Sequence, residues 1–123
     1  MTHLRPAFAM VLLLGGCTTV SPTGRPDNVR IGQVAHVGGL RVTPESVIED
    51  SRCPMNARCV WAGRVRLRVT VGGEGKAERR QLTLGEPSIL NGHALVLTSV
   101  RPDRMANRAL TPKDYRFDFE VRQ

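Results

Sequence analysis

The sequence predicts a small all-β domain, an antiparallel sandwich or barrel of six to seven strands. Residues 64–71 and 115–122 alternate between apolar and polar side chains, which is typical of strands that have one buried face and one wet face. Turn residues, chiefly glycine, proline and asparagine, separate these stretches from other short apolar runs. No segment keeps the roughly 3.6-residue apolar period of an amphipathic helix, so a helical fold class is excluded.

Six segments are expected to be strands, namely 33–37, 40–48, 64–71, 80–84, 93–100 and 115–122. The glycine-rich residues 72–78 are expected to form a hairpin loop between the third strand and the fourth. The Asn-Gly pair within residues 90–93 predicts another hairpin turn at the start of the fifth strand. Residues 101–114, with a proline near each end, are expected to be a long polar connection with a helical turn near its centre.

The charges on the two clearest strands predict that these strands are neighbours. Residues 64–68 place three arginines on the outer face of the strand 64–71, and the outer face of 115–122 carries acidic residues. If the two strands pair, opposite charges face one another and add a modest stabilisation. The basic face is otherwise expected to be a solvated strand surface, and the alternative is a recognition surface.

Residues 1–16 have the features of a signal peptide. Arg5 supplies a positive charge, and residues 7–14 are uncharged and mostly apolar. As a helix this apolar stretch would span roughly 12 Å, whereas the hydrocarbon core of a bilayer is about 30 Å thick. No other stretch reaches the length of about eighteen uncharged apolar residues, so no membrane-spanning segment is predicted.

Leu14-Gly15-Gly16-Cys17 resembles the lipobox of bacterial lipoproteins. The resemblance implies that Cys17 receives a diacylglycerol, that the chain is cut just before it, and that the new amino group is acylated. Several acyl chains on one residue give stable membrane anchoring. The implied location is the bacterial cell envelope, and Thr18 in place of an aspartate favours the outer membrane over the inner. The alternative is an ordinary secretory signal in which the cysteine stands by chance.

Composition divides the remaining chain into a tether and one domain. Residues 17–30 are expected to be the lipidated cysteine and a flexible tether rich in threonine, proline and glycine, and residues 31–123 the β-domain. The formal net charge of +7 favours contact with anionic lipid head groups or an anionic envelope polymer. Nucleic acid is excluded as a partner, because the location is wrong and no aromatic stacking platform lies among the basic residues.

Cys53 and Cys59 are expected to form a disulfide-closed loop. Exported compartments are oxidising, and lipidation of Cys17 leaves an even pair. Closing so short a loop stabilises a domain by about 2 kcal/mol in the chain-entropy picture. Two alternatives compete with this prediction. A zinc or copper site would need further ligands such as His36 or His93, and the chain has no CxxC or HxxxH spacing; a redox-active pair would also need CxxC.

The stretch EDSRCPMNARCVWAG, residues 49–63, resembles a group of small exported bacterial proteins of unassigned function that share an R-C-P-x4-C-x-W-x-G pattern. The resemblance implies export and a β fold, and it implies no activity. From the residues themselves, we expect Asp50 and Arg52 to bond across the base of the loop. Gly63 is expected to allow a bulge or a close approach of another backbone.

Trp61 is the only tryptophan of the chain. We expect it to cover the disulfide and anchor the core, and the alternative is that it stacks on a ligand. A loop held by a disulfide is also a rigid display surface, since preorganisation lowers the entropy cost of binding. The candidate binding surface is therefore Met55, Asn56, Arg58 and Trp61.

These observations favour a non-catalytic protein. The chain has no GxSxG, HExxH, glycine-rich phosphate loop or paired-carboxylate motif, so neither an enzyme nor a cofactor is expected. The leading hypothesis is a membrane-tethered envelope β-domain with a binding or structural role, whose expected partner is an envelope protein or an anionic polymer. The second is a ligand-binding or protease-inhibitor-like module that uses the Cys53–Cys59 loop.

Overall fold

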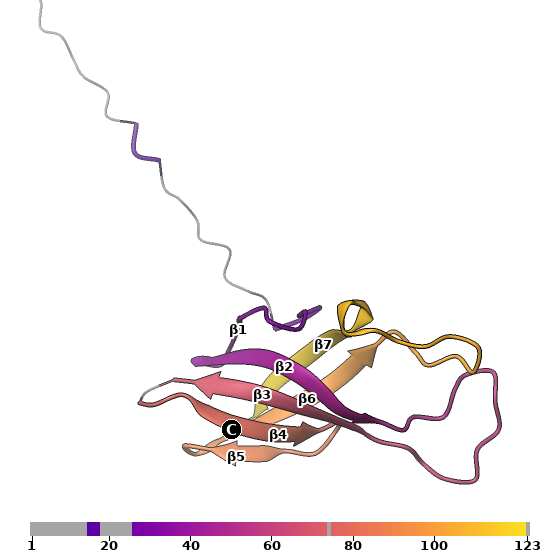
Figure 1. Cartoon of the computed structure of the whole chain (residues 1–123). Coiled ribbons are helices and arrows are strands. Elements are labelled where there is room, and N and C mark those ends of the chain that lie inside the picture. Colours follow the sequence, from indigo (N-terminus) through magenta and orange to yellow (C-terminus); the bar gives the residue numbers. More distant parts are fainter. Residues whose placement is uncertain (1–14, 18–25, 74, 123) are drawn as a thin grey trace, which may run out of the picture.

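The protein is all-β, and two antiparallel sheets of four and three strands face one another (Figure 1). This arrangement was obtained as a computed structural model that describes residues 15–17, 26–73 and 75–122. It confirms the predicted fold class, a small antiparallel sandwich of seven strands with a disulfide-closed loop. The expected signal peptide and most of the expected tether lie outside the described residues.

The first sheet has the strand order β1-β2-β3-β4, and the second has the order β5-β6-β7. The first four strands are β1 (Ala35–Val37), β2 (Leu40–Asp50), β3 (Val65–Gly72) and β4 (Glu78–Thr83). The second sheet contains β5 (Ser88–Leu90), β6 (His93–Arg101) and β7 (Arg116–Arg122), and a single 3-10 turn, η1 (Pro112–Asp114), precedes β7. β5 was not predicted from the sequence. The helical turn predicted near the centre of residues 101–114 is η1, which lies at the end of that connection.

The period-two pattern correctly predicts which side chains are buried. The four apolar residues of β3 point into the space between the sheets, and so do Phe117 and Phe119 of β7. Tyr115 stacks on Phe117 with ring centroids 5.8 Å apart, which continues the apolar row beyond the strand. Removing this surface from water is the main force that holds the two sheets together.

The predicted pairing of the third strand with the last is wrong. β3 lies between β2 and β4, whereas β7 pairs with β6 in the other sheet. The charged side chains find partners on their own sheets: Arg64 bonds Glu49 of β2 at 2.6 Å, and Asp118 bonds Arg101 of β6 at 2.6 Å. The alternation of a strand specifies its buried face but carries little information about its neighbour.

The folded domain begins before residue 31, earlier than the composition indicates. Val29 is fully buried, and it exchanges two backbone hydrogen bonds with Phe117, of 2.8 and 2.9 Å. The Phe119 amide donates to the Pro26 carbonyl at 2.8 Å, and the Asn28 amide donates to the Asp118 carboxylate at 2.7 Å. The segment from residue 26 therefore covers part of the edge of β7.

Candidate functional site

Two loops lie side by side at one end of the sandwich, at the right of Figure 1. The cysteine loop, residues 51–64, joins β2 to β3. The facing loop, residues 102–111, leads from β6 towards η1. The cysteine loop contains all four residues of the predicted binding surface, namely Met55, Asn56, Arg58 and Trp61.

The disulfide predicted from the export signal is present. Cys53 and Cys59 are joined, with their Cα atoms 5.9 Å apart. Between them the chain forms a tight turn, in which the Ala57 amide donates to the Pro54 carbonyl at 3.1 Å. The cross-link therefore fixes a compact turn and not an extended segment.

The base of the cysteine loop is closed by backbone contacts between its two ends. The Ser51 amide donates to the Arg64 carbonyl at 2.9 Å, and the Arg64 amide donates to the Ser51 hydroxyl at 3.0 Å. Gly63 fits between them as predicted, because a Cβ at this position would lie 1.7 Å from the Ser51 carbonyl oxygen. Only glycine allows the two ends to approach so closely.

Arg52 connects the loop base to the end of β6. Its Nε and one terminal nitrogen donate to the two oxygens of Asp50, both at 2.9 Å, which is the contact predicted from the sequence. The other bonds were not predicted: the guanidinium also donates to the carbonyls of Val100 and Pro102 at 3.0 and 3.1 Å. The side chains of Arg52 and Asp50 are only 16% and 8% exposed, so these charge-assisted bonds are largely shielded from water.

Arg104 of the facing loop also holds the base of the cysteine loop in place. Its guanidinium donates to the carbonyls of Asp50 and Arg52 at 3.1 and 2.9 Å, and its own carbonyl accepts the Met55 amide at 2.8 Å. The Asn56 side chain accepts the Ala106 amide at 2.8 Å, so Asn56 is a structural residue of the loop. This role of Arg104 was not predicted, because nothing in its local sequence distinguishes it from other surface arginines.

Tyr115 completes the cluster at the loop base. Its hydroxyl donates to Asp50 at 2.8 Å. Burial, and then the hydrogen bond to the Asp50 carboxylate, raise the pKa of Tyr115 to about 12. Burial alone would raise the pKa of Asp50, but the bonds from Arg52 and Tyr115 outweigh it and hold that pKa below its ordinary value. Asp50 is therefore an ionised structural anchor at neutral pH.

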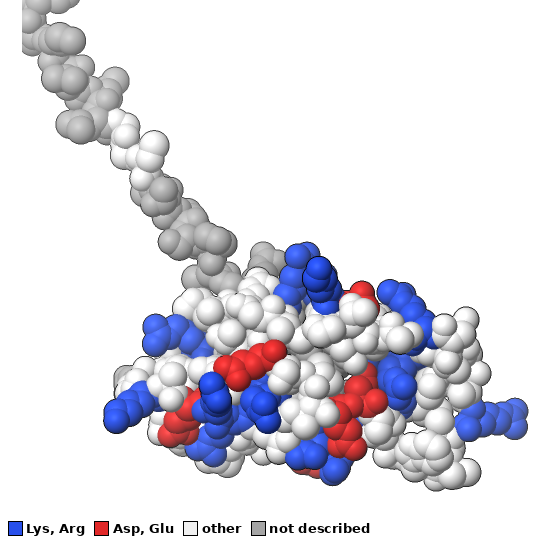
Figure 2. All heavy atoms as spheres, in the orientation of Figure 1, with Lys and Arg blue, Asp and Glu red and all other residues white. Residues whose placement is uncertain are grey.

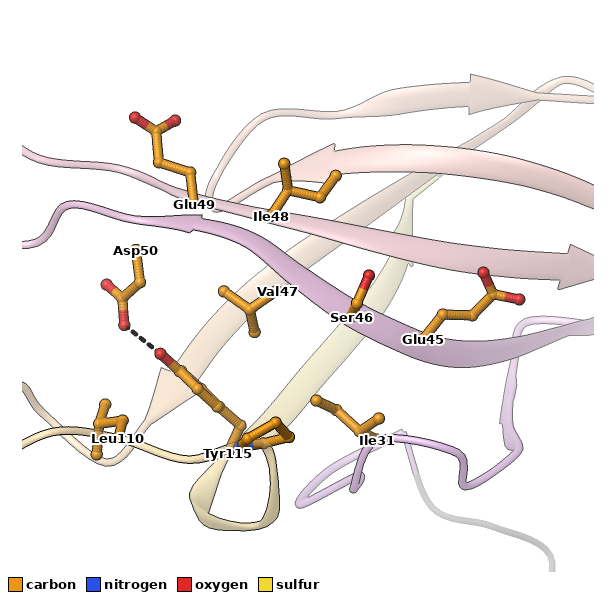
Figure 3. A pocket seen from close by; sticks show the side chains of 10 residues that line it. Ile31, Glu45, Ser46, Val47, Ile48, Glu49, Asp50, Leu110 and Tyr115 are labelled. Carbon is orange, nitrogen blue, oxygen red and sulfur yellow. Dashed lines mark hydrogen bonds between the residues drawn. The ribbon is translucent and has the colours of Figure 1, made fainter.

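A hollow of about 340 Å³ lies beside this cluster, between β2, the end of the facing loop and Tyr115 (Figure 3). Val47, Leu110 and Ile31 contribute apolar surface to it, whereas Glu49 projects from the opposite side of β2. Asp50 and Tyr115 stand at one end and bond each other. The two titratable groups at that end are thus already paired, which makes it a poor site for acid–base chemistry.

The prediction that Trp61 anchors the core is wrong. Its side chain is 63% exposed, Met55 is 69% exposed, and Val60 is 97% exposed. With Met105 of the facing loop, these residues make up four of the seven large apolar side chains exposed in the described part of the chain. The loop projects beyond the two sheets, so the strands fill the core without Trp61.

The metal site that the sequence left open as an alternative to the disulfide is not assembled in the described part of the chain. Among residues 15–17, 26–73 and 75–122, no three histidine, cysteine or acidic side chains lie close enough together to hold a metal ion. His36 is exposed on β1, and the Nδ1 atom of His93 is buried with no hydrogen-bond partner in that part of the chain. The described residues also contain no helix long and apolar enough to cross a membrane.

The positive charge on the outer face of residues 64–68 is partly compensated by acidic neighbours. Glu49 bonds Arg64 at 2.6 Å and lies 3.9 Å from Arg66, and Glu45 lies 3.9 Å from Arg79 of β4. Figure 2 shows basic and acidic side chains intermixed over this face, whereas the loop end is mostly uncharged with some basic side chains. Such exposed pairs contribute little stability, and they dilute the positive charge of the face.

No protein-family model, curated protein or solved structure matches this chain. The site is therefore defined by its own geometry.

Proposed function

We propose that this protein is a membrane-tethered domain of the bacterial envelope that binds a partner through the cysteine loop and catalyses no reaction. One observation carries the proposal. Met55, Val60 and Trp61 are exposed on a loop that a disulfide and two shielded arginines hold in place. Membrane attachment rests on the resemblance of residues 14–17 to a lipobox.

Exposed apolar side chains in a fixed loop are unfavourable unless something covers them. Monomeric proteins seldom cluster large apolar residues at one protruding point without a binding role. A pre-ordered loop also loses less conformational entropy on binding than a flexible one. Tryptophan is among the residues that contribute most to interface energies, so Trp61 is the expected centre of the contact.

The arrangement of charged groups supports binding over catalysis. The titratable residues that line the hollow beside the loop are all bonded: Asp50 and Tyr115 bond each other, Glu49 bonds Arg64, and Glu45 bonds Thr70. A tyrosine with a pKa of about 12 is too weakly acidic to exchange protons readily at neutral pH. Asp50 and Tyr115 position the cysteine loop.

A contact surface also fits the loop better than a protease-inhibitor role does. A protease binds an inhibitor segment in an extended form, as an added strand. The segment between Cys53 and Cys59 instead folds into a turn closed by the bond from Ala57 to Pro54. The apolar residues Val60 and Trp61 follow the second cysteine and lie outside the cross-linked segment.

Site-specific photo-crosslinking in intact cells tests the proposal. Benzoylphenylalanine, a photoreactive residue that keeps a large aromatic side chain where Trp61 is replaced, is placed at position 55 or 61. The matched control is position 89, because Ile89 is 66% exposed and lies on β5 away from the loop. We expect a discrete adduct from positions 55 and 61 and none from 89. Equal labelling from all three positions, or none from the loop in correctly localised protein, would contradict the proposal.

A further inference from the structure

The tip of the cysteine loop, residues 55–61, combines apolar and basic side chains and has no acidic ones. Residues 51–63 contain no aspartate or glutamate. Arg58 is exposed between the apolar residues Met55 and Val60. The two loops carry five arginines and one acidic residue, Asp103. Three of these arginines, Arg52, Arg64 and Arg108, lie within 4.0 Å of an acidic side chain just outside the loops, so the positive charge of the tip comes chiefly from Arg58.

We propose that this tip binds the surface of an anionic phospholipid bilayer, with Val60 and Trp61 entering the interfacial layer and Arg58 contacting lipid phosphates. The inference rests on the proposed function and names its partner. It gives the domain a second membrane contact, distinct from the one expected at Cys17.

The shape of the tip favours a bilayer. The cysteine loop projects from the end of the sandwich (Figure 1), and Val60, at 97% exposed, has almost no contact with its own protein. A projecting residue of this kind is easily buried by a soft, laterally continuous phase, whereas a protein partner would need a cavity shaped to receive it. Met55 and Val60 match the apolar part of the interface.

The residue types at the tip fit the layers of a membrane interface. Tryptophan is enriched at the level of the head groups, where its ring is half in hydrocarbon and its N–H remains hydrated. Arginine beside it is attracted to the negative surface potential of anionic lipids. The negative charge of Asp50 would otherwise oppose this attraction, and the two bonds from the Arg52 guanidinium compensate it.

A lipid-anchored domain needs only weak additional affinity for such a contact. An anchor confines the loop near the bilayer, which raises its effective concentration there. The contact would then choose one orientation of the domain among the many that a tether allows. The rigid pinning of the cysteine loop by Arg52 and Arg104 makes that orientation definite.

Because Trp61 is the only tryptophan of the chain, its fluorescence reports the position of the loop directly. The full chain is reconstituted into vesicles of phosphatidylglycerol or of phosphatidylcholine, and lipids brominated on the acyl chain serve as quenchers. In phosphatidylglycerol vesicles we expect the emission to move to shorter wavelength and to lose most of its intensity to the brominated lipid. In phosphatidylcholine, and in phosphatidylglycerol at high salt, both effects should be much smaller.

Variants separate the loop from the rest of the chain. The double variant Met55→Ser with Val60→Ser and the single variant Arg58→Gln should each reduce the quenching several-fold, since all three residues are exposed and their replacement spares the fold. The matched controls Ile89→Ser and Arg79→Gln alter exposed positions away from the loop and should leave the quenching unchanged.

The outcomes distinguish this inference from the proposed function. Emission from Trp61 that stays long-wavelength and unquenched in both vesicle types overturns the bilayer contact. If photo-crosslinks from positions 55 and 61 then join a protein, the proposed function stands with a different partner. Lipid adducts from the same positions, together with quenching, support both, and the absence of adducts and quenching overturns both.

Discussion

The body of the sandwich and the cysteine loop are stabilised by different interactions. The body is held by apolar side chains from both sheets, with Phe117, Leu67 and Leu97 fully buried. The cysteine loop buries no such core, and a disulfide, an ion pair and arginine-to-carbonyl bonds hold it in place. Because polar bonds and the disulfide hold the loop in place, its apolar residues need not be buried and can face outward.

The largest effect expected from this comparison is in the body. Replacing Phe117 by alanine should lower the free energy of unfolding by about 3–5 kcal/mol, because a large, fully buried ring is lost and a cavity remains. Urea denaturation followed by circular dichroism measures it, with exposed Ile89→Ala as the control. A change below 1 kcal/mol, on the order of a surface substitution, would mean that the sheets do not pack around Phe117.

Arg52→Ala tests the polar pinning of the loop. We expect a loss of about 2–4 kcal/mol, somewhat below the figure for a fully buried pair, because Asp50 and two carbonyls lose their donor while keeping slight access to water. Arg58→Ala, on the same loop but exposed, is the matched control and should change stability little. Equal effects of the two substitutions in the same denaturation assay would show that Arg52 is an ordinary surface residue.

Removing the disulfide should have a smaller effect than removing Arg52. The double variant Cys53→Ser with Cys59→Ser should lower the free energy of unfolding by about 2 kcal/mol, mainly by freeing the unfolded chain. The arginine contacts remain, so hydrogen exchange at the Met55 amide should stay partly protected by Arg104. Complete loss of that protection would mean that the cross-link, and not the polar cluster, fixes the loop.

Tyr115→Phe removes one hydrogen bond to Asp50 and should lower stability by about 1 kcal/mol at neutral pH. The pH dependence is more specific. The pKa of Tyr115 is raised from 10.0 to about 12, so its contribution is complete below pH 10 and is lost as the pH rises through 12. Thermal melts between these values should therefore show a decline in the parent protein that is absent from Tyr115→Phe. Parallel declines would contradict the assignment.

The smallest effect is expected for Trp61→Ala. A surface substitution changes stability by less than about 0.5 kcal/mol, whereas loss of a core tryptophan removes about 3–5 kcal/mol. With the side chain 63% exposed, we expect the first value. With the photoreactive probe at position 55, the same substitution should abolish the loop's photo-crosslinks. Trp61→Ala would then abolish binding while leaving the free energy of unfolding almost unchanged.

Several features follow from the sequence because they depend on neighbouring residues. Alternation along the chain predicts the buried face of β3 and of β7, and turn residues predict most of the connections. The pairing of Cys53 with Cys59, the bond between Asp50 and Arg52, and the close approach at Gly63 also involve residues close in the chain or a local backbone constraint.

Other features were decided only by the tertiary structure. Whether β3 pairs with β2 or with β7, and whether Val29 belongs to a tether or to the core, depends on segments that are distant in the chain. The same holds for Arg104, which contacts residues more than fifty positions away. Trp61 is exposed because the sheets close their core before the loop begins, and no local pattern contains that information. Short-range periodicity specifies which faces of the strands are apolar, and the packing of distant segments decides which apolar residues become buried.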